Sequence, residues 1–163
     1  RLQRLMGQSD AVIATLKTLN AHNPASLPLA AQLMVEAALA TNRAEEVKAL
    51  LQAHYTQAPS LDVLESLVGI ELADEATRDT ARQRYVQHLD KEASLVAATK
   101  WLADEKLAHE EFHPQIQKAL EQATKPLTRY RCAACGFEAR QHFWQCPGCQ
   151  TWDSYPARRV EEL

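Results

Sequence analysis

Glycine is scarce in this chain of 163 residues, which contains only four. A loop that cradles a phosphate group needs several glycines close together, and no such loop occurs here. The sequence also lacks a nucleophile elbow and a plausible catalytic triad. We therefore expect no enzymatic activity from the residue pattern.

Long apolar runs and signal patterns are missing as well. No run of about 18 apolar residues, the length that a membrane-spanning helix needs, is present. No secretory signal pattern is visible. The chain starts at Arg1 without methionine, so we expect a fragment whose anchor or targeting element lies upstream.

A basic stripe is also absent. The net charge is −3, and it divides into −4 for residues 1–125 and +1 for residues 126–163. Binding to a phosphate backbone needs clustered Lys and Arg side chains on one face. The charge distribution therefore argues against a zinc ribbon that binds nucleic acid.

Cysteine is confined to one short stretch, where it forms two Cys-x-x-Cys pairs separated by ten residues. The four residues are Cys132, Cys135, Cys146 and Cys149. Two such pairs suit one tetrahedral metal ion, and four thiolates leave no coordination position for water or substrate. Zinc and iron both accept this ligand set. Two disulfides or four free thiols are the alternatives, but the spacing favours a structural metal site.

Turn-forming residues flank the cysteines. Gly136 follows the first pair, where a positive φ is cheap only for glycine, and Pro147 and Gly148 lie inside the second pair. We expect a β-hairpin between the pairs, with residues 137–141 facing residues 142–145. Six of the ten aromatic residues fall in the last 38 positions. We expect these rings to dock the small domain on the last helices, because they supply most of its apolar area.

Residues 1–125 read as a succession of helices, rich in Ala, Leu, Glu, Gln and Lys. The composition changes near Pro126. We therefore predict two domains, a helical domain over 1–125 and a four-cysteine domain over 126–163. The expected helices cover 1–6, 9–22, 28–41, 43–57, 60–73, 75–90, 94–109 and 114–124.

An internal repeat of about 34 residues is visible in the helical part. Its turn position is occupied by Gly7, Asn42 and Ala76 in successive copies, and Pro24 and Pro59 close the first two copies. This period of helix pairs resembles the tetratricopeptide repeat and predicts a solenoid rather than an ordinary helical bundle.

A solenoid of this kind presents a concave face made by the first helix of each pair, and such a face binds proteins. The residues that we expect to line this face are Gln32, Glu36, Leu39, Val63, Ser66 and Ile70.

One short motif suggests a zinc protease. His109 and His113 satisfy the His-Glu-x-x-His signature, which needs both histidines on one helical face. Pro114 follows His113, and the residue before a proline is pushed out of the α region. We therefore expect His113 in a turn and reject the peptidase interpretation.

The stretch from Tyr130 to Trp152 resembles a rubredoxin knuckle pair. It has Cys-x-x-Cys-Gly-Phe in its first half and Cys-Pro-x-Cys in its second half. It departs from rubredoxin in its short loop and in Gln150, which replaces the usual glycine. Both departures weaken the alternative of a rubredoxin-like electron carrier.

Helical repeats followed at once by this knuckle pair, with Trp144 and Trp152 placed around its second half, resemble the lipopolysaccharide assembly protein B family (LapB). The resemblance implies four metal-ligating cysteines, one iron or zinc ion and no catalytic residues. It also implies a place at the cytoplasmic face of the bacterial inner membrane, reached through an N-terminal membrane helix that this chain lacks.

The function implied by this resemblance is that of a non-enzymatic adaptor. Such an adaptor brings the deacetylase that commits precursors to lipid A to the membrane protease FtsH, and so limits lipopolysaccharide synthesis. Other inner-membrane lipopolysaccharide factors are further expected partners. The alternative besides an electron carrier is a general tetratricopeptide interaction module with a structural zinc knuckle.

Overall fold

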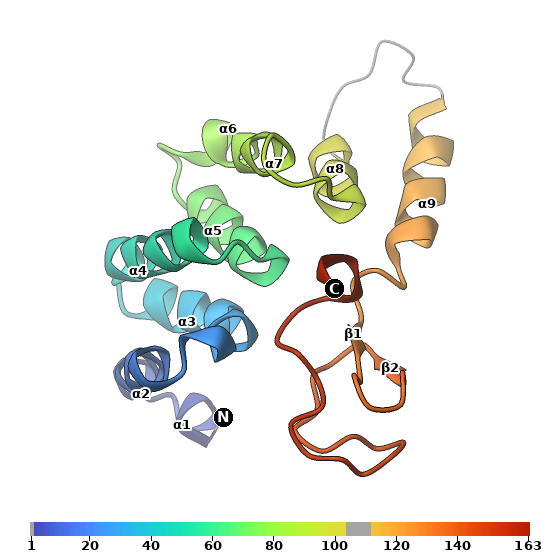
Figure 1. The fold of residues 1–163 in the computed structure, drawn as a ribbon. Coiled ribbons are helices and arrows are strands. Elements are labelled where there is room, and N and C mark those ends of the chain that lie inside the picture. Colours follow the sequence, from blue (N-terminus) through green and yellow to red (C-terminus); the bar gives the residue numbers. More distant parts are fainter. Residues whose placement is uncertain (1, 104–111) are drawn as a thin grey trace. The chain divides into compact units, whose positions relative to one another are not determined.

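A computed structural model describes residues 2–103 and 112–163 (Figure 1). The protein is mostly helical, with helices packed in pairs and a small two-stranded four-cysteine knuckle at its C-terminal end. Its contacts divide it into two compact units, residues 1–81 and residues 82–163. The first unit has the repeat helices, and the second unit combines further helices with the knuckle.

The first unit is entirely helical (Figure 1). Its elements are α1 (Leu2–Leu5), α2 (Ser9–His22), a 3₁₀ turn (Pro24–Ser26), α3 (Pro28–Ala40), α4 (Ala44–Gln57), α5 (Leu61–Ala73) and α6 (Arg78–Ala81).

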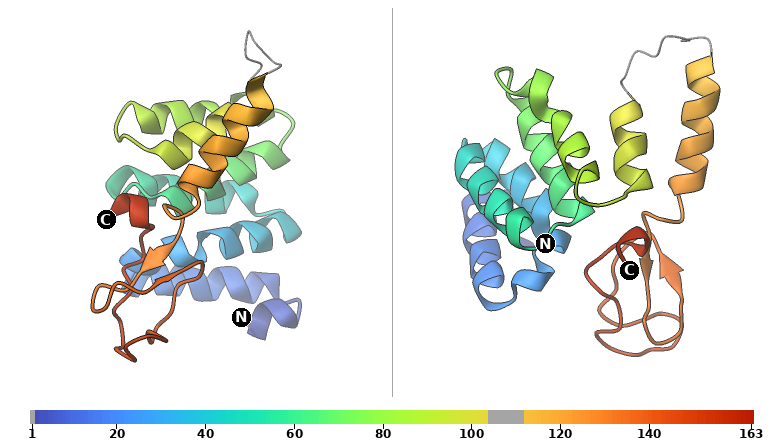
Figure 2. Two further views of the ribbon diagram at one scale, coloured as in Figure 1. Left: turned by 90° about the vertical axis from the view of Figure 1, so that its right-hand side faces the viewer. Right: turned by 45° about the horizontal axis from the view of Figure 1, so that its top comes forward.

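In its described residues, 82–103 and 112–163, the second unit begins with helices and ends with the knuckle and a short 3₁₀ helix. Its elements are α7 (Gln83–Leu89), α8 (Leu95–Leu102), α9 (His113–Thr124), β1 (Tyr130–Arg131), β2 (Glu138–Ala139) and the C-terminal 3₁₀ helix (Val160–Glu162). Helices α8 and α9 lie side by side in both views of Figure 2 and pack against each other.

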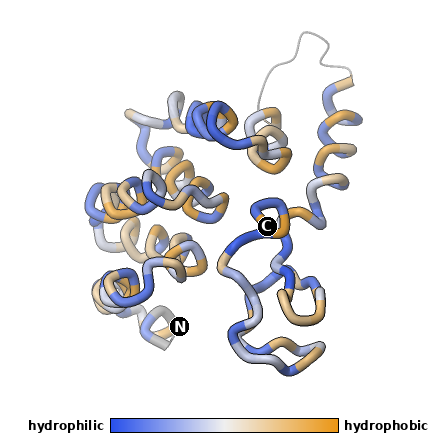
Figure 3. Tube along the Cα trace, in the orientation of Figure 1, coloured by the Kyte–Doolittle hydropathy of each residue, from blue (hydrophilic) through white to orange (hydrophobic). Residues whose placement is uncertain are grey.

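Helix α3 is the centre of the first unit, because it packs against α2, α4 and α5. Its Met34, Ala31 and Ala38 are fully buried. Small residues on α3 let the neighbouring helices approach closely, and Val47 and Leu51 of α4 are fully buried as well. Helix α9 is different: apolar and polar stretches alternate along it turn by turn (Figure 3), and only Thr124 on it is buried.

The repeat is visible in the backbone conformation of the turns between helix pairs. Gly7 and Asn42 both have a left-handed backbone, with φ of 69° and 54°. Asparagine tolerates this conformation better than most residues. Ala76, at the third turn position, does not adopt it, since alanine has no polar side chain that could offset the cost of this conformation. Its N–H instead bonds the Asp74 side chain at 3.0 Å.

The helix that follows the third turn differs from the prediction. A single helix over 75–90 was expected, but the chain forms α6 and α7 with a break at Arg82. The other expected helices of the described residues are found, with ends that differ by a few residues. Helix α8 ends at Leu102, and the remainder of the expected helix 94–109 runs into residues 104–111, outside the described residues.

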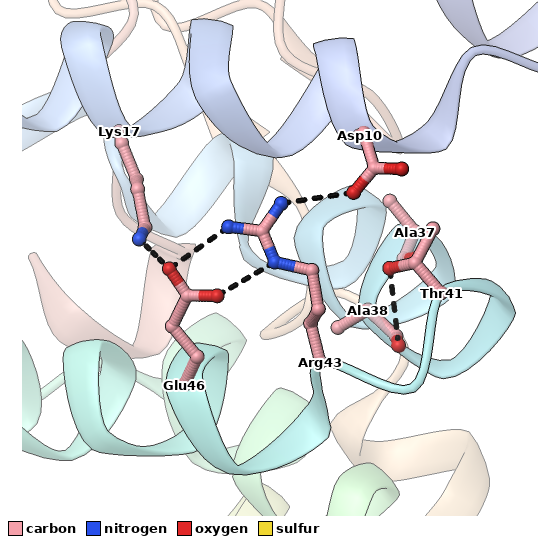
Figure 4. A network of polar contacts seen from close by, with 7 residues as sticks. All are labelled: Asp10, Lys17, Ala37, Ala38, Thr41, Arg43 and Glu46. Atoms are coloured by element: carbon pink, nitrogen blue, oxygen red, sulfur yellow. Dashed lines mark hydrogen bonds and ion pairs between the residues drawn. The ribbon is translucent and has the colours of Figure 1, made fainter.

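A polar network ties α2 to α4 in the first unit (Figure 4). Arg43, just before α4, bonds Asp10 of α2 at 3.0 Å and Glu46 at 2.7 Å. Lys17 of α2 also contacts the Glu46 carboxylate. These side chains are partly exposed, so each pair contributes little by itself.

The predicted domain boundary at residue 126 marks a change of architecture. The contacts nonetheless group α7, α8 and α9 with the knuckle. The division into 1–125 and 126–163 therefore stays a prediction. Within residues 2–103 and 112–163, no helix has the length and apolar character needed to cross a membrane.

Candidate metal centre

The C-terminal knuckle domain contains two Cys-x-x-Cys turns, called the first and second knuckles. Each of them lies in its own small hairpin. Strand β1 pairs antiparallel with β2 around the first pair, with Tyr130 opposite Ala139. Gln145 and Trp152 form an antiparallel bridge around the second pair. The expected hairpin of residues 137–141 against 142–145 is therefore wrong. Each knuckle pairs the strands that flank it, because its tight turn brings those strands together.

The two knuckles have the same backbone pattern. The carbonyl of Cys132 accepts the N–H of Gly136 at 2.9 Å, and the carbonyl of Cys146 accepts the N–H of Gln150 at 2.8 Å. Gly136 and Gln150 both have positive φ, 77° and 61°. Gln150 therefore occupies the position that glycine holds in the first knuckle.

The four sulfur atoms converge on one point. Cys132 Sγ lies 3.8 Å from Cys149 Sγ, and Cys135 Sγ lies 3.7 Å from Cys146 Sγ. All four lie within 4.8 Å of one another. Around a metal with a metal–sulfur bond of about 2.3 Å, the edge of a tetrahedron is about 3.8 Å long.

These separations exclude disulfides in this structure, since a disulfide bond is about 2.05 Å long. All four cysteines are free. The cluster suits one metal ion and leaves zinc and iron equally acceptable by ligand type. A bound ion would link the two knuckles, and the four protein ligands would close its coordination shell.

Hydroxyl groups lie beside two of the sulfurs. The Ser154 hydroxyl is 3.2 Å from Cys132 Sγ, and the Thr151 hydroxyl is 3.3 Å from Cys149 Sγ. The Ser154 contact lowers the pKa of Cys132 to about 6, and the Thr151 contact lowers the pKa of Cys149. A metal-bound thiolate accepts hydrogen bonds only, so both hydroxyls favour the form that binds a metal.

Ser154 and Thr151 were missed by sequence reasoning. The only available signal is their position just after the second knuckle, where hydroxyl residues commonly stabilise turns. The four cysteines themselves are found together as expected, alternating between buried and exposed along the chain.

The aromatic residues of the knuckle separate into two groups. Tyr130 and Tyr155 are buried, and the His142 ring packs edge-on between them. Trp144 and Trp152 are 58% and 66% exposed. The expectation that the aromatics as a group dock the knuckle on the last helices is therefore wrong for the two tryptophans.

Gln150 leads to a first prediction. Replacing Gln150 by glycine should stabilise the second knuckle by about 1 kcal/mol, because glycine adopts φ of 61° without Cβ strain. The reference change is Gly136→Ala, which should destabilise the first knuckle by a similar amount. Chelator-induced unfolding followed by tryptophan fluorescence measures both, and equal midpoints for Gln150→Gly and the parent would contradict the idea.

The predicted partner-binding residues lie in two kinds of environment. Gln32, Glu36 and Leu39 are exposed on α3. Val63, Ser66 and Ile70 of α5 are buried, so these three are not on an accessible surface as predicted. The helical period places them correctly on one face of α5, but that face is covered in the folded chain.

The protease signature falls partly outside the described residues, which omit His109. His113 is the first residue of α9, so the expectation that it lies in a turn between two helices is wrong; a proline is tolerated in the first turn of a helix, and Pro114 lies there. The His113 Nε2 lies 3.1 Å from the carbonyl of Leu102. With this nitrogen bonded to a backbone carbonyl, only Nδ1 of His113 could bind a metal.

Comparisons with known proteins agree with this geometry. A family described as "Rubredoxin metal binding domain", of the LapB zinc-ribbon type, matches residues 130–155. Proteins named "Lipopolysaccharide assembly protein B" from Escherichia coli strains K12 and O157:H7 are 44% identical over 36 residues. This match spans 22% of the chain and only 9% of the length of those relatives. The C-terminal part is thus a LapB-like metal-binding domain.

Proposed function

We propose that this chain is part of a non-enzymatic adaptor in which a metal ion gives a helical-repeat protein its C-terminal shape. One observation carries the proposal: four sulfurs lie at the spacing of a closed tetrahedral site, inside the same compact unit as helices α7 to α9. A closed site holds structure and offers no position to a substrate.

The regulated process is lipopolysaccharide synthesis. The name of the E. coli relatives, lipopolysaccharide assembly protein B, supports this assignment. On this proposal the adaptor brings the lipid A pathway deacetylase to the FtsH protease at the cytoplasmic face of the inner membrane. Other inner-membrane lipopolysaccharide factors would bind the same scaffold.

The exposed side of α3 is the proposed partner surface. Gln32, Glu36 and Leu39 follow one another at spacings of four and three residues, so they share a face of the helix. Leu39 is 43% exposed and supplies an apolar contact beside two polar ones. Helical-repeat proteins commonly bind their partners through such surfaces.

The test is a pull-down with the full-length natural protein that contains this chain, using purified deacetylase and FtsH as prey. We expect both to be retained by the parent protein and lost from the Cys146→Ser variant. Leu39→Arg should weaken capture while the metal content stays at one ion per chain. Capture that is indifferent to both changes, together with an iron form that cycles reversibly, would replace the adaptor by an electron carrier.

A further inference from the structure

The carboxylate of Glu161 contacts the N-terminus of helix α8, more than 60 residues earlier in the chain. Its Oε1 accepts the N–H of Leu95 at 2.6 Å and the N–H of Val96 at 3.1 Å. Its Oε2 accepts the hydroxyl of Ser94 at 2.8 Å. One side chain thus holds three consecutive residues at the start of a helix.

These bonds complete the first turn of α8. The first N–H groups of any helix have no partner within the helix. The N–H of Ala97 bonds the Ser94 hydroxyl at 2.9 Å, and the N–H of Ala98 bonds the Ser94 carbonyl at 3.1 Å. Glu161 satisfies the two that remain, those of Leu95 and Val96. A carboxylate at this position is also favoured by the helix dipole.

Helix α8 needs this support because it has only eight residues. Isolated helices of that length are unstable in water. Without Glu161, the N–H groups of Leu95 and Val96 would have to turn to solvent, and the first turn would fray.

The position of Glu161 is set by the chain that enters the knuckle. The N–H of Val160 bonds the carbonyl of Arg129 at 2.7 Å, and the N–H of Glu161 bonds the carbonyl of Leu127 at 3.2 Å. The Arg159 guanidinium lies 4.6 Å from the centre of the Tyr130 ring and also donates to the carbonyl of Thr128. The C-terminal 3₁₀ helix is thereby fixed to residues 127–130.

Residues 154–163, called the tail below, are also attached to the first knuckle through Ser154 and Tyr155. The carbonyl of Ser154 accepts the N–H of Ala133 at 2.7 Å. The Tyr155 hydroxyl donates to the carbonyl of Phe137 at 3.1 Å. Tyr130, which supports Arg159, precedes Cys132 by two residues. One support of the tail therefore comes from the first Cys-x-x-Cys turn and the residues just after it, and the other comes from the residues that lead directly into this turn.

We propose that Glu161 is a positioning residue that couples metal binding in the knuckle to the order of helix α8. The proposal rests on the metal site of the proposed function. The metal holds the first knuckle, the knuckle holds the tail, and the tail holds Glu161 at α8. Val96 and Thr99 also line a groove of about 380 Å³ between α8 and α9, so the metal state would set the shape of that groove.

Amide hydrogen exchange of the zinc-loaded chain, followed residue by residue by NMR, tests the coupling. Removing zinc with a chelator should speed the exchange of the Leu95 and Val96 amides about tenfold, the size expected for the loss of an ordinary cap. Glu161→Ala should do the same with zinc still bound at one ion per chain. Glu161→Gln, which keeps one acceptor oxygen, should give an intermediate rate.

Glu92→Ala is the matched control, because it removes the same charge two residues before Ser94 and leaves the cap intact. It should leave the exchange of Leu95 and Val96 unchanged. In the Glu161→Ala variant, removing zinc should cause little further increase in the exchange rate of the α8 amides, since the contact between Glu161 and α8 is already lost. An additive response would mean that metal and Glu161 act separately, and would overturn the coupling.

The outcomes also separate this inference from the adaptor proposal. If the chain takes up no metal, both fail together. A second outcome is that metal binds and partner capture depends on it, but the exchange rate of the α8 amides is unchanged by chelation and by Glu161→Ala. In that case the coupling alone is wrong and the adaptor proposal remains. A response of α8 to both changes supports the coupling whichever partners are captured.

Discussion

Cys146→Ser is expected to abolish metal binding and to unfold the knuckle. Cys146 is 1% exposed, and its sulfur lies 3.7 Å from Cys135 Sγ. A serine oxygen is a poor replacement for a thiolate, so the site loses one of four ligands where no water can substitute easily. Structural zinc contributes roughly 10–16 kcal/mol to the folding of small domains at neutral pH, which is far more than the knuckle gains from its own core.

Metal content by mass spectrometry under native conditions measures the first effect, and we expect it to fall from one ion per chain to none. Tryptophan fluorescence measures the second effect. All three tryptophans, Trp101, Trp144 and Trp152, lie in the second unit, so the signal reports on that unit alone.

Gln141→Ser provides the control for this experiment. Gln141 is exposed and lies between the two knuckles, so serine there should leave metal content and fluorescence unchanged. A Cys146→Ser protein that retained a full complement of metal would show that the four sulfurs do not form the site that their distances indicate.

The metal ligands could be predicted from sequence because their chemistry is local. Two Cys-x-x-Cys pairs define two turns, and the turn geometry brings each pair of sulfurs together whatever surrounds them. The strand pairing around the turns could not be predicted in the same way. Residues 137–145 are long enough for a hairpin of their own, but β1 pairs with β2 and Gln145 pairs with Trp152 instead.

The helices illustrate the same limit. The composition and the apolar spacing of the sequence locate α2 to α5 closely, because these signals are local to each helix. They do not reveal which side of α5 is covered, so Val63, Ser66 and Ile70 were placed on a surface that is in fact buried. Exposure depends on neighbours distant in the chain. The contact of Glu161 with α8 leaves no trace in the sequence for the same reason.

Leu51→Ala is expected to destabilise the protein by about 2–5 kcal/mol. Leu51 of α4 is fully buried. Truncation removes three buried carbon atoms, a methine and two methyl groups, and leaves a cavity that a packed helix pair only partly closes. A loss of this size is a large share of the total stability of a domain, so we expect the far-UV circular dichroism transition to shift by many degrees.

Leu39→Ala makes the identical chemical change at a site that is 43% exposed on α3, and so serves as the matched control. It should cost less than about 0.5 kcal/mol, since surface substitutions away from special features are nearly neutral. The pair therefore separates two roles of leucine in this helical array. Equal losses at both positions would mean that the α3 surface is packed against something in solution, and would withdraw Leu39 from the proposed partner surface.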